Sequence, residues 1–298
     1  MAITKETAPI NLKSSIKTFL GSTLSVMFPA RARRIRAQFT LPAVEAPPQR
    51  YRWTVVDSLI RRSIAHELTA KEQVHPGTLE QAHAAFWQSA DAYYARNDRT
   101  RDHFIPNYGD TVVSLRDLVE SMDIRQVVEF GCGDGNWLRW LRDNWSHPRD
   151  FTGIDLSTRQ IARNLRQHPD LEFQCEDLVH WAREHARDHS LFHTNSGVLE
   201  YLSEQRVADL FAILRAAGEQ VIVFLIEPLY GDFDPETDER SVVLGSEHSY
   251  SHNYPRLLAE AGFEVLRQEE RLGSGHRNLL VVARSRRASD PGDVAAGS

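Results

Sequence analysis

The chain has 298 residues, of which 41% are hydrophobic and 26% are charged, and its net charge at pH 7 is −6. These values are typical of a folded protein with a substantial core, and they exclude a largely disordered chain. The negative net charge gives no general attraction to nucleic acid, so we expect no nucleic-acid partner. The two cysteines, Cys132 and Cys175, stand in apolar, strand-like contexts without metal-ligand spacing. We therefore expect two small core residues in a reducing compartment, with no disulfide framework and no metal site.

The N-terminal residues 1–41 form a basic arm. No Asp or Glu occurs between Thr7 and Val44, whereas Lys and Arg are frequent there. Apolar residues at helical spacing predict an amphipathic helix that ends at Pro29: Leu12, Ile16, Phe19, Leu20, Leu24, Met27 and Phe28. Such a helix packs on its own domain or on another subunit through residues 10–36, or it lies on an anionic membrane surface. The apolar run is too short for a membrane span, so we expect a cytoplasmic protein, with peripheral membrane contact as the alternative.

Residues 42–112 predict a helical cap. Residues 42–50 are rich in proline and are typical of a linker. The pattern from Tyr51 to about Asn97 is helical, and residues 106–110 predict a loop that contains Tyr108.

A strand, a glycine turn and a helix follow one another between Gln126 and Trp145. The apolar strand Gln126–Phe130 precedes Gly131, Gly133 and Gly135, and the helix begins near Asn136. Glycines let the backbone bend sharply, approach a ligand closely and present amide groups at the start of a helix. A dinucleotide fingerprint would require glycine at position 136, so Asn136 disfavours NAD.

Acidic residues follow the next two predicted strands. Asp155 ends the strand Phe151–Ile154, where a carboxylate can accept hydrogen bonds from both hydroxyls of a ribose. Ser157 predicts the cap of the following helix. Asp177 follows the strand Leu171–Cys175, and it also suits the start of a helix, where an acid complements the helix dipole.

Strands and helices alternate from Val113 onward, beginning with a helix over Val113–Met122. This alternation is the signature of a doubly wound α/β domain with a mostly parallel sheet. Further strands are predicted at Ser190–Asn195, Gln220–Ile226, Phe263–Arg267 and Asn278–Arg284, the last two as a hairpin. Residues 231–252 are too long for a minimal connection and predict a functional loop, and residues 286–298 predict a disordered tail.

Gly-x-Gly-x-Gly with Glu129 two positions before its first glycine resembles motif I of the class I S-adenosylmethionine (SAM)-dependent methyltransferases. The resemblance covers residues 113–285. It implies a Rossmann-like sheet of seven strands in the order 3-2-1-4-5-7-6, with an antiparallel last strand. It also implies SAM as cofactor and S-adenosyl-L-homocysteine as product.

The resemblance implies a set of cofactor-binding residues. Asp155 and Leu156 would meet the ribose, Asp177 would accept from the adenine amino group, and Leu178 would pack on the ring. Helices before motif I often cover SAM in this family, so Tyr93, Tyr94 and Tyr108 are candidate lid residues, or else ordinary core aromatics. The full set of candidates is Glu129, Gly131, Gly133, Gly135, Asp155, Leu156, Asp177, Leu178, Ser196 and Tyr94.

The acceptor side is less well defined. Ser196 and the next turn match motif IV, but Leu191-Phe192-His193 replaces the usual acid at the strand start. The sequence lacks Asn/Asp-Pro-Pro-Tyr/Phe, which disfavours DNA bases and protein glutamine as acceptors. The candidate catalytic residues are His248, His252, Glu200 and Tyr201. Glu227, after the strand Gln220–Ile226, and Tyr250, in the long loop, are further candidates near the expected acceptor face.

The expected function is methyl transfer to an oxygen or nitrogen atom of a small-molecule acceptor, such as a natural-product intermediate, a sugar or an amine. One alternative is a SAM-binding protein that regulates or scaffolds a partner without catalysis. Another is a methyltransferase for a lipid-linked acceptor at a membrane surface. An NAD-dependent oxidoreductase is opposed by Asn136 and by the terminal hairpin.

Overall fold

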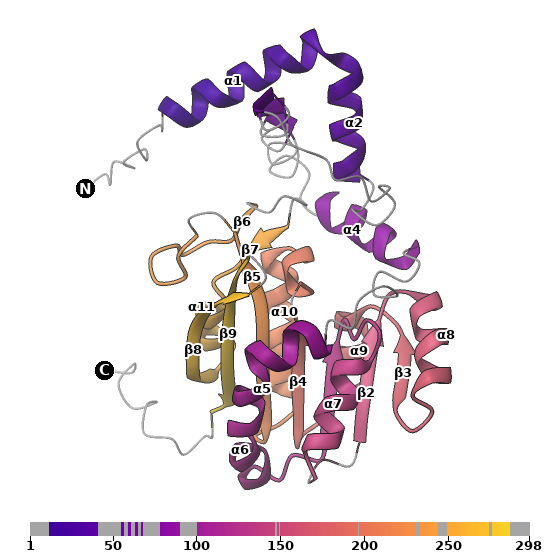
Figure 1. The fold of residues 1–298 in the computed structure, drawn as a ribbon. Coiled ribbons are helices and arrows are strands. Elements are labelled where there is room, and N and C mark those ends of the chain that lie inside the picture. The colour runs from indigo at the N-terminus through magenta and orange to yellow at the C-terminus, as the bar shows by residue number, and fades with distance from the viewer. Residues whose placement is uncertain are drawn as a thin grey trace, which may run out of the picture. The chain divides into compact units, whose positions relative to one another are not determined.

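A computed structural model describes residues 12–40, parts of 55–67, 78–89, 100–146, 148, 150–195, 197–230, 233–243, 249–273 and 276–286. The chain divides into two compact units. The first holds Met1–Leu79 and Ser246–His248, and the second holds Glu80–Gly245 and Ser249–Ser298. The second unit contains the strands and most of the helices (Figure 1).

The second unit is built on a seven-stranded sheet in the order β3-β2-β1-β4-β5-β9-β8. Its parallel strands are β1 (Gln126–Phe130), β2 (Asp150–Asp155), β3 (Glu172–Cys175), β4 (Ser190–Asn195) and β5 (Val221–Leu229). Strand β9 (His276–Ser285) enters antiparallel between β5 and β8 (Phe263–Gly273). Because β8 and β9 are the predicted sixth and seventh strands, the predicted fold class and strand order are confirmed.

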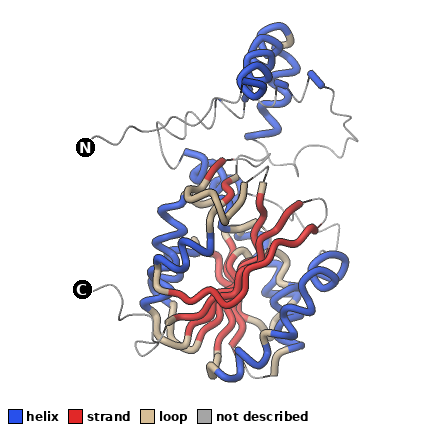
Figure 2. Tube along the Cα trace, turned by 90° about the vertical axis from the view of Figure 1, so that its left-hand side faces the viewer, coloured by secondary structure: helices blue, strands red, loops and turns tan. Residues whose placement is uncertain are grey.

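Helices cover both faces of this sheet, which is seen between them in Figure 2. One face packs against α5 (Ile105–Ser114), α6 (Arg116–Ser121), α7 (Asn136–Asn144) and α8 (Thr158–Gln167). The other packs against α9 (Leu178–His185), α10 (Glu204–Ala216) and α11 (Tyr254–Glu260). All residues of β1, β4 and β5 are buried, as expected for strands covered on two sides.

Four shorter elements and one helix complete the described part of this unit. A π-helical turn, η1 (Thr100–Phe104), precedes α5, and a 3₁₀ turn, η2 (Leu199–Tyr201), follows β4. Strands β6 (Val242–Val243) and β7 (Tyr250–Ser251) pair within the predicted long loop. Helix α4 (Thr78–Ser89) starts at the boundary of the two units.

The strand order reverses between β1 and β4, which lie side by side while their connections run to opposite halves of the sheet. In open α/β sheets, a crevice forms beyond the carboxyl ends of the strands at such a point. The fold thus positions a ligand site at the turns that follow β1, β2, β3 and β4.

The loop predicted at residues 106–110 is wrong, because these residues form the first turns of α5. Pro106 lies in the first helical turn, where its missing N–H costs no hydrogen bond. Helix α5 is separated from α6 at Leu115, so the predicted single helix Val113–Met122 is two helices. Tyr108 is fully buried among core side chains, which supports the core reading of this aromatic rather than the lid reading.

Two strand ends and one cysteine also differ from expectation. Strand β5 runs on through Glu227 to Leu229, and β8 extends to Gly273, because both keep pairing with β9. Cys132 is buried as predicted, but Cys175 is exposed, so its prediction as a core residue is wrong. Strand β3 is at the sheet edge and buries only one of its four residues, Phe173.

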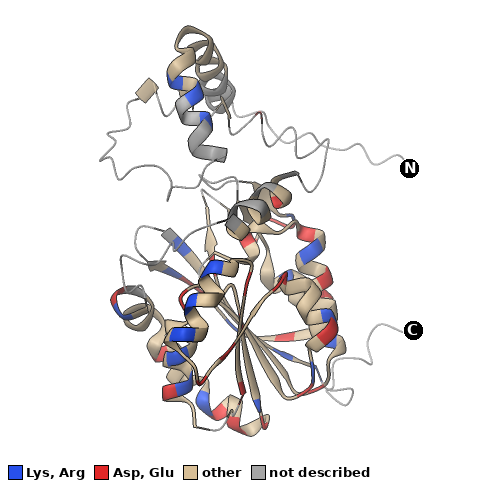
Figure 3. Ribbon diagram, turned by 90° about the vertical axis from the view of Figure 1, so that its right-hand side faces the viewer, with Lys and Arg blue, Asp and Glu red and all other residues tan. Residues whose placement is uncertain are grey.

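The first unit contains α1 (Leu12–Met27) and α2 (Pro29–Thr40). The predicted helix does end before Pro29, but a second helix begins at that proline. Gly21 packs against the carbonyl of Leu59, whereas Phe19 and Val26 are 71% and 82% exposed. The described charged residues of α2 are basic (Figure 3). None of the helices in the described part of the chain has the length and apolarity of a membrane span.

The predicted linker 42–50 and tail 286–298 lie outside the described residues, apart from Arg286. The boundaries predicted at residues 41 and 112, and membrane contact or self-association through residues 10–36, stay predictions.

A buried histidine joins three elements of the second unit. Trp137 Nε1 on α7 donates to His193 Nε2 on β4 over 2.7 Å, and His193 Nδ1 lies 2.8 Å from the carbonyl oxygen of Phe224 on β5. An indole N–H only donates and a carbonyl only accepts, so the imidazole is neutral with its hydrogen on Nδ1. Burial lowers the pKa of His193 to about 4.

We predict that His193→Gln weakens the pH dependence of stability below pH 6.5. In the wild type, unfolding frees His193 to bind a proton between its ordinary pKa of 6.5 and about 4, so acid lowers the free energy of unfolding. Glutamine keeps one donor and one acceptor but does not titrate. The slope should fall by up to about 1.4 kcal/mol per pH unit, measured by urea unfolding across this range. The same change at exposed His185 is the control, and an equal effect at both sites would contradict the assignment.

Candidate functional site

The glycine turn after β1 has a conformation that excludes other residues at its first position. Gly131, Gly133 and Gly135 all have positive φ, of 66°, 49° and 72°. A Cβ on Gly131 would lie 2.4 Å from Val198 Cγ2. The backbone of the turn therefore packs directly against the loop after β4. Gly135 is the N-cap of α7.

Asp155, at the end of β2, holds this turn in place. Its Oδ2 accepts from the backbone N–H of Gly133 at 3.0 Å, and its Oδ1 accepts from Ser157 at 2.9 Å. Burial raises the pKa of Asp155, although these backbone N–H groups act in the opposite direction. Ser157 caps α8 by accepting from the N–H of Gln160, as predicted. One carboxylate thus links two neighbouring βα turns.

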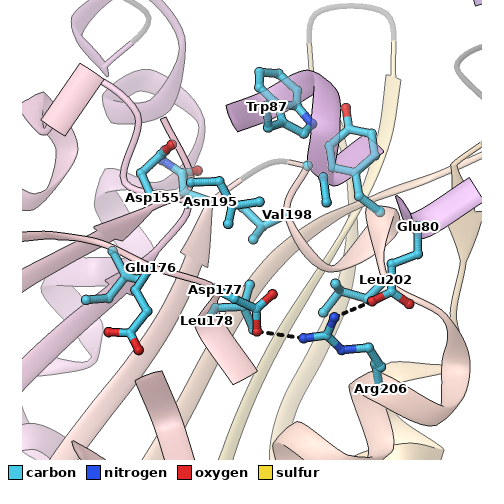
Figure 4. A pocket seen from close by; sticks show the side chains of 16 residues that line it. Glu80, Trp87, Asp155, Glu176, Asp177, Leu178, Asn195, Val198, Leu202 and Arg206 are labelled. Carbon is cyan, nitrogen blue, oxygen red and sulfur yellow. Dashed lines mark hydrogen bonds and ion pairs between the residues drawn. The ribbon is translucent and has the colours of Figure 1, made fainter. Parts of the chain in front are cut away.

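A pocket opens where these turns meet (Figure 4). Its empty volume is about 790 Å³, counted with the open space at its mouth. Of the predicted residues, six line it: Gly131, Asp155, Leu156, Asp177, Leu178 and Tyr201. The other described candidates, Glu129, Gly133, Gly135, Glu200 and His252, are not among its lining residues. Tyr93, Tyr94, Ser196 and His248 lie outside the described residues.

Glu129 is 2% exposed, on the strand beneath the glycine turn. Burial raises its pKa well above the ordinary value, and the negative charges of Asp134 and Asp155 add to this effect. The backbone N–H of Leu138, in the first turn of α7, acts against both. The predicted acid of motif I thus lies under the turn, and it supports the turn rather than lining the pocket.

Arg206 on α10 connects two acidic residues of the pocket wall. Its guanidinium pairs with Glu80 of α4 and, at 2.6 Å, with Asp177 Oδ1. Glu80 is 8% exposed and also accepts from the N–H of Ser203 at 3.2 Å. Asp177 caps α9, as the alternative interpretation of this residue predicted, by accepting from the N–H groups of Val179 and His180. The two carboxylates and Arg206 fasten α4 to the rest of the pocket wall (Figure 4).

The loop after β4 forms another wall and is held from below by Glu227. This side chain is fully buried on β5, and its Oε2 accepts from the N–H of Val198 at 3.1 Å. Burial raises the pKa of Glu227 to about 7, while hydrogen bonds from Thr194 and from backbone groups of the loop lower it. Glu227 therefore supports the loop and is not part of the lining.

Aromatic and amide groups complete the wall beside this loop. The rings of Trp87 and Tyr201 are 5.5 Å apart and tilted, and both residues line the pocket. Asn195, the last residue of β4, also lines it and is 7% exposed. Neither its amide nitrogen nor its amide oxygen has a hydrogen-bond partner.

His252 is fully buried and both of its ring nitrogens are engaged. Nε2 donates to the carbonyl oxygen of Leu199 at 3.2 Å, so Nδ1 accepts from the Ser241 hydroxyl at 2.6 Å. Burial lowers the pKa of His252 to about 4. This arrangement offers no free nitrogen to an acceptor in the pocket, and a base role for His252 stays an untested prediction.

Several lining residues were missed by sequence reasoning, and among them are Glu80, Trp87, Asn195 and Arg206. The helical pattern around Leu79 did predict a cap, but nothing local marks Glu80 or Trp87 as facing a ligand. Asn195 ends a predicted strand at the switch point, and this position was the one available signal.

Comparisons with known proteins agree with this architecture. Residues 127–218 match a family described as methyltransferase domain. The trans-aconitate 2-methyltransferase of Escherichia coli O139:H28 is 35% identical over 182 residues, which cover 55% of this chain and 66% of that protein. The protein of the same name in Shigella flexneri serotype 5b is 34% identical with equal coverage. The chain thus spans slightly less than two thirds of the length of these curated relatives.

A solved SAM-dependent methyltransferase of Leishmania major shares the fold, with a TM-score of 0.52 and 11% identity. The match covers 74% of this chain and 91% of that one. The sheet order, the glycine turn and the family match define a Rossmann-like domain of the methyltransferase class. Residues 127–218 of this chain therefore form a methyltransferase domain, which agrees with the class I SAM-dependent methyltransferases that motif I indicated.

We predict that Gly131→Ala lowers the free energy of unfolding by about 1–3 kcal/mol, because alanine is strained at this φ and its Cβ meets Val198. In a Val198→Ala background the cost should be smaller, since the clash is removed and the backbone strain remains. Gly109→Ala in α5 is the control, because its Cβ would make an ordinary 3.5 Å contact with Trp140. Denaturant unfolding measures all three, and equal costs at the two glycines would contradict the prediction.

We also predict that Arg206→Met speeds amide hydrogen exchange in residues 80–89. Removal of the guanidinium leaves Glu80 buried without its cation, so this part of α4 should open more often. Arg183→Met, at an exposed arginine of α9, is the matched control. Wild-type exchange rates in residues 80–89 of the Arg206 variant would show that another contact holds the helix.

Proposed function

We propose that this chain transfers a methyl group from SAM to an oxygen or nitrogen atom of a small-molecule acceptor. The observation that carries the proposal is the meeting of three βα turns in one pocket: Gly131 after β1, Asp155 and Leu156 after β2, and Asp177 and Leu178 after β3. A glycine turn, a strand-end carboxylate and an acid beside an apolar side chain are the groups that an adenosine moiety requires.

The pocket residues fit such a ligand. The bare backbone at Gly131 leaves room that a Cβ would fill, and the start of α7 follows the turn. Asp155 presents its carboxylate to the pocket while two backbone N–H groups fix its orientation. Asp177 and Leu178 lie at the start of α9, where the resemblance puts the adenine contacts.

SAM, when bound, supplies a methyl group already activated by a sulfonium, so the protein mainly has to hold an acceptor close and in line. Asn195, Trp87 and Tyr201 are available for that positioning task on the remaining wall of the pocket. The relatives are named for trans-aconitate, a small tricarboxylate, which supports a small-molecule acceptor without identifying the acceptor of this chain.

We expect Asp155→Ala to weaken SAM binding by about 1–3 kcal/mol, because hydrogen bonds to a charged group are lost. Calorimetric titration with SAM and, separately, with S-adenosylhomocysteine measures the effect. Asp150→Ala is the control, since this exposed residue is the first of β2 and lies at the end of the strand opposite to Asp155. If the wild type is folded and binds neither compound, the proposed function is wrong. If it binds both and Asp155→Ala binds equally well, only the role of Asp155 is wrong.

A further inference from the structure

We propose that the acceptor is an amine, received by Asn195 and the Trp87 and Tyr201 rings, with the carboxylate of Glu200 behind this part of the lining. This inference rests on the proposed function and narrows its acceptor to one chemical class. It follows from the lining groups other than those that the proposed function assigns to the adenosine moiety.

The charges of the described lining residues disfavour an anionic acceptor. Four of these residues are acidic, namely Glu80, Asp155, Glu176 and Asp177, and one, Arg206, is basic. Arg206 already pairs with both Glu80 and Asp177. A carboxylate in the pocket would thus find no unengaged cation among the described lining residues, and its desolvation would cost free energy without compensation.

The side-chain amide of Asn195 has hydrogen-bonding groups that no other group in the described part of the protein pairs with. Its side chain is more than nine-tenths buried and lines the pocket, yet both its donor and its acceptor lack partners. Buried amides without partners are costly, so a ligand that restores a hydrogen bond gains free energy. The amide oxygen is an acceptor suited to an amine N–H.

Glu200 adds negative charge behind the same wall. It is 2% exposed on η2, and its Oε1 would lie 2.6 Å from a Cβ on Gly197, which lines the pocket. Because Gly197 has no side chain, only backbone separates this carboxylate from the pocket at that point. Aromatic faces such as those of Trp87 and Tyr201 also attract cations.

Tyr254 of α11 is a titratable group that interacts electrostatically with Glu200. It is fully buried, and its hydroxyl has no hydrogen-bond partner. Burial raises the pKa of Tyr254 well above its ordinary value, and the nearby Glu227 and Glu200 add to this effect, so the hydroxyl stays protonated and neutral beside Glu200.

The chemistry of the transfer agrees with this charge distribution. An amine that binds as the ammonium first loses one proton to water. The lone pair of the neutral amine then forms the new N–C bond, the C–S bond breaks, and its electron pair stays on sulfur. The positive charge moves from sulfur to nitrogen, and the methylated ammonium later loses one proton to water. Fixed negative charge near the acceptor stabilises the charge that develops on nitrogen. A carboxylate acceptor would instead need a cation to hold it.

The test is calorimetric titration of the protein saturated with S-adenosylhomocysteine, at neutral pH and low salt. The probes are benzylamine, its anionic analogue benzoate, and trans-aconitate. We expect benzylamine to bind and the two anions to bind at least about tenfold more weakly, because a charge-assisted hydrogen bond contributes at least that factor.

Variants assign the effect to residues. Glu200→Gln and Asn195→Ala should each weaken benzylamine binding by about tenfold. Glu184→Gln, which makes the same change in charge on the exposed side of α9, should not. Retained affinity for S-adenosylhomocysteine shows that a variant is folded, and two independent variants keep the test decisive if one of them is not.

Each outcome has one meaning. No binding of S-adenosylhomocysteine by the folded wild type refutes the proposed function itself. Binding of S-adenosylhomocysteine with no binding of benzylamine, or with preferred binding of trans-aconitate, refutes the amine proposal and leaves the proposed function intact. Unchanged benzylamine affinity in both folded variants also refutes it.

Discussion

The hydrogen bond from Gly133 N to Asp155 Oδ2 is the contact on which the rest of the site depends. It ties the turn after β1 to the end of β2. The same turn places Gly131 in close contact with Val198 of the loop after β4. The segments that follow β1, β2 and β4 are thereby held in one arrangement. The negative charges of Asp134 and Asp155 also act on buried Glu129, where they add to the rise of its pKa that burial causes. Backbone N–H groups offset part of that charge, and a positively charged ligand would offset more.

The parts of the site that could be predicted are those encoded by neighbouring residues. The glycine spacing identified the turn, and the position of Asp155 after an apolar strand identified the carboxylate. Asp177 was visible in the same way, as a helix-starting acid. Glu80 and Arg206 could not be predicted, because they are 126 positions apart in the sequence and neither belongs to a local motif. Trp87 looks like any aromatic residue of an amphipathic helix until its contact with the ring of Tyr201 is known.

The predictions about the fold that were wrong also failed because the deciding contacts are not encoded by neighbouring residues. Pro106 and Gly109 favour a turn locally, but Pro106 suits a first helical turn and a helix tolerates an isolated glycine such as Gly109. Cys175 belongs to an edge strand that buries a single residue, and the edge position is a property of the whole sheet. His193 occupies the strand in which the family pattern has an acid. Its hydrogen bonds to Trp137 and Phe224 allow a neutral ring to fill that place inside an apolar layer.

The attachment of α4 changes what counts as the smallest functional piece of this protein. The family resemblance begins at residue 113, yet Glu80, Ala84 and Trp87 form one wall of the pocket. A fragment cut at the start of the resemblance would keep the whole sheet and the glycine turn. It would also leave Arg206 with only one of its two carboxylates and would open the pocket to solvent on one side. The family resemblance and the unit of binding therefore have different N-terminal limits in this chain.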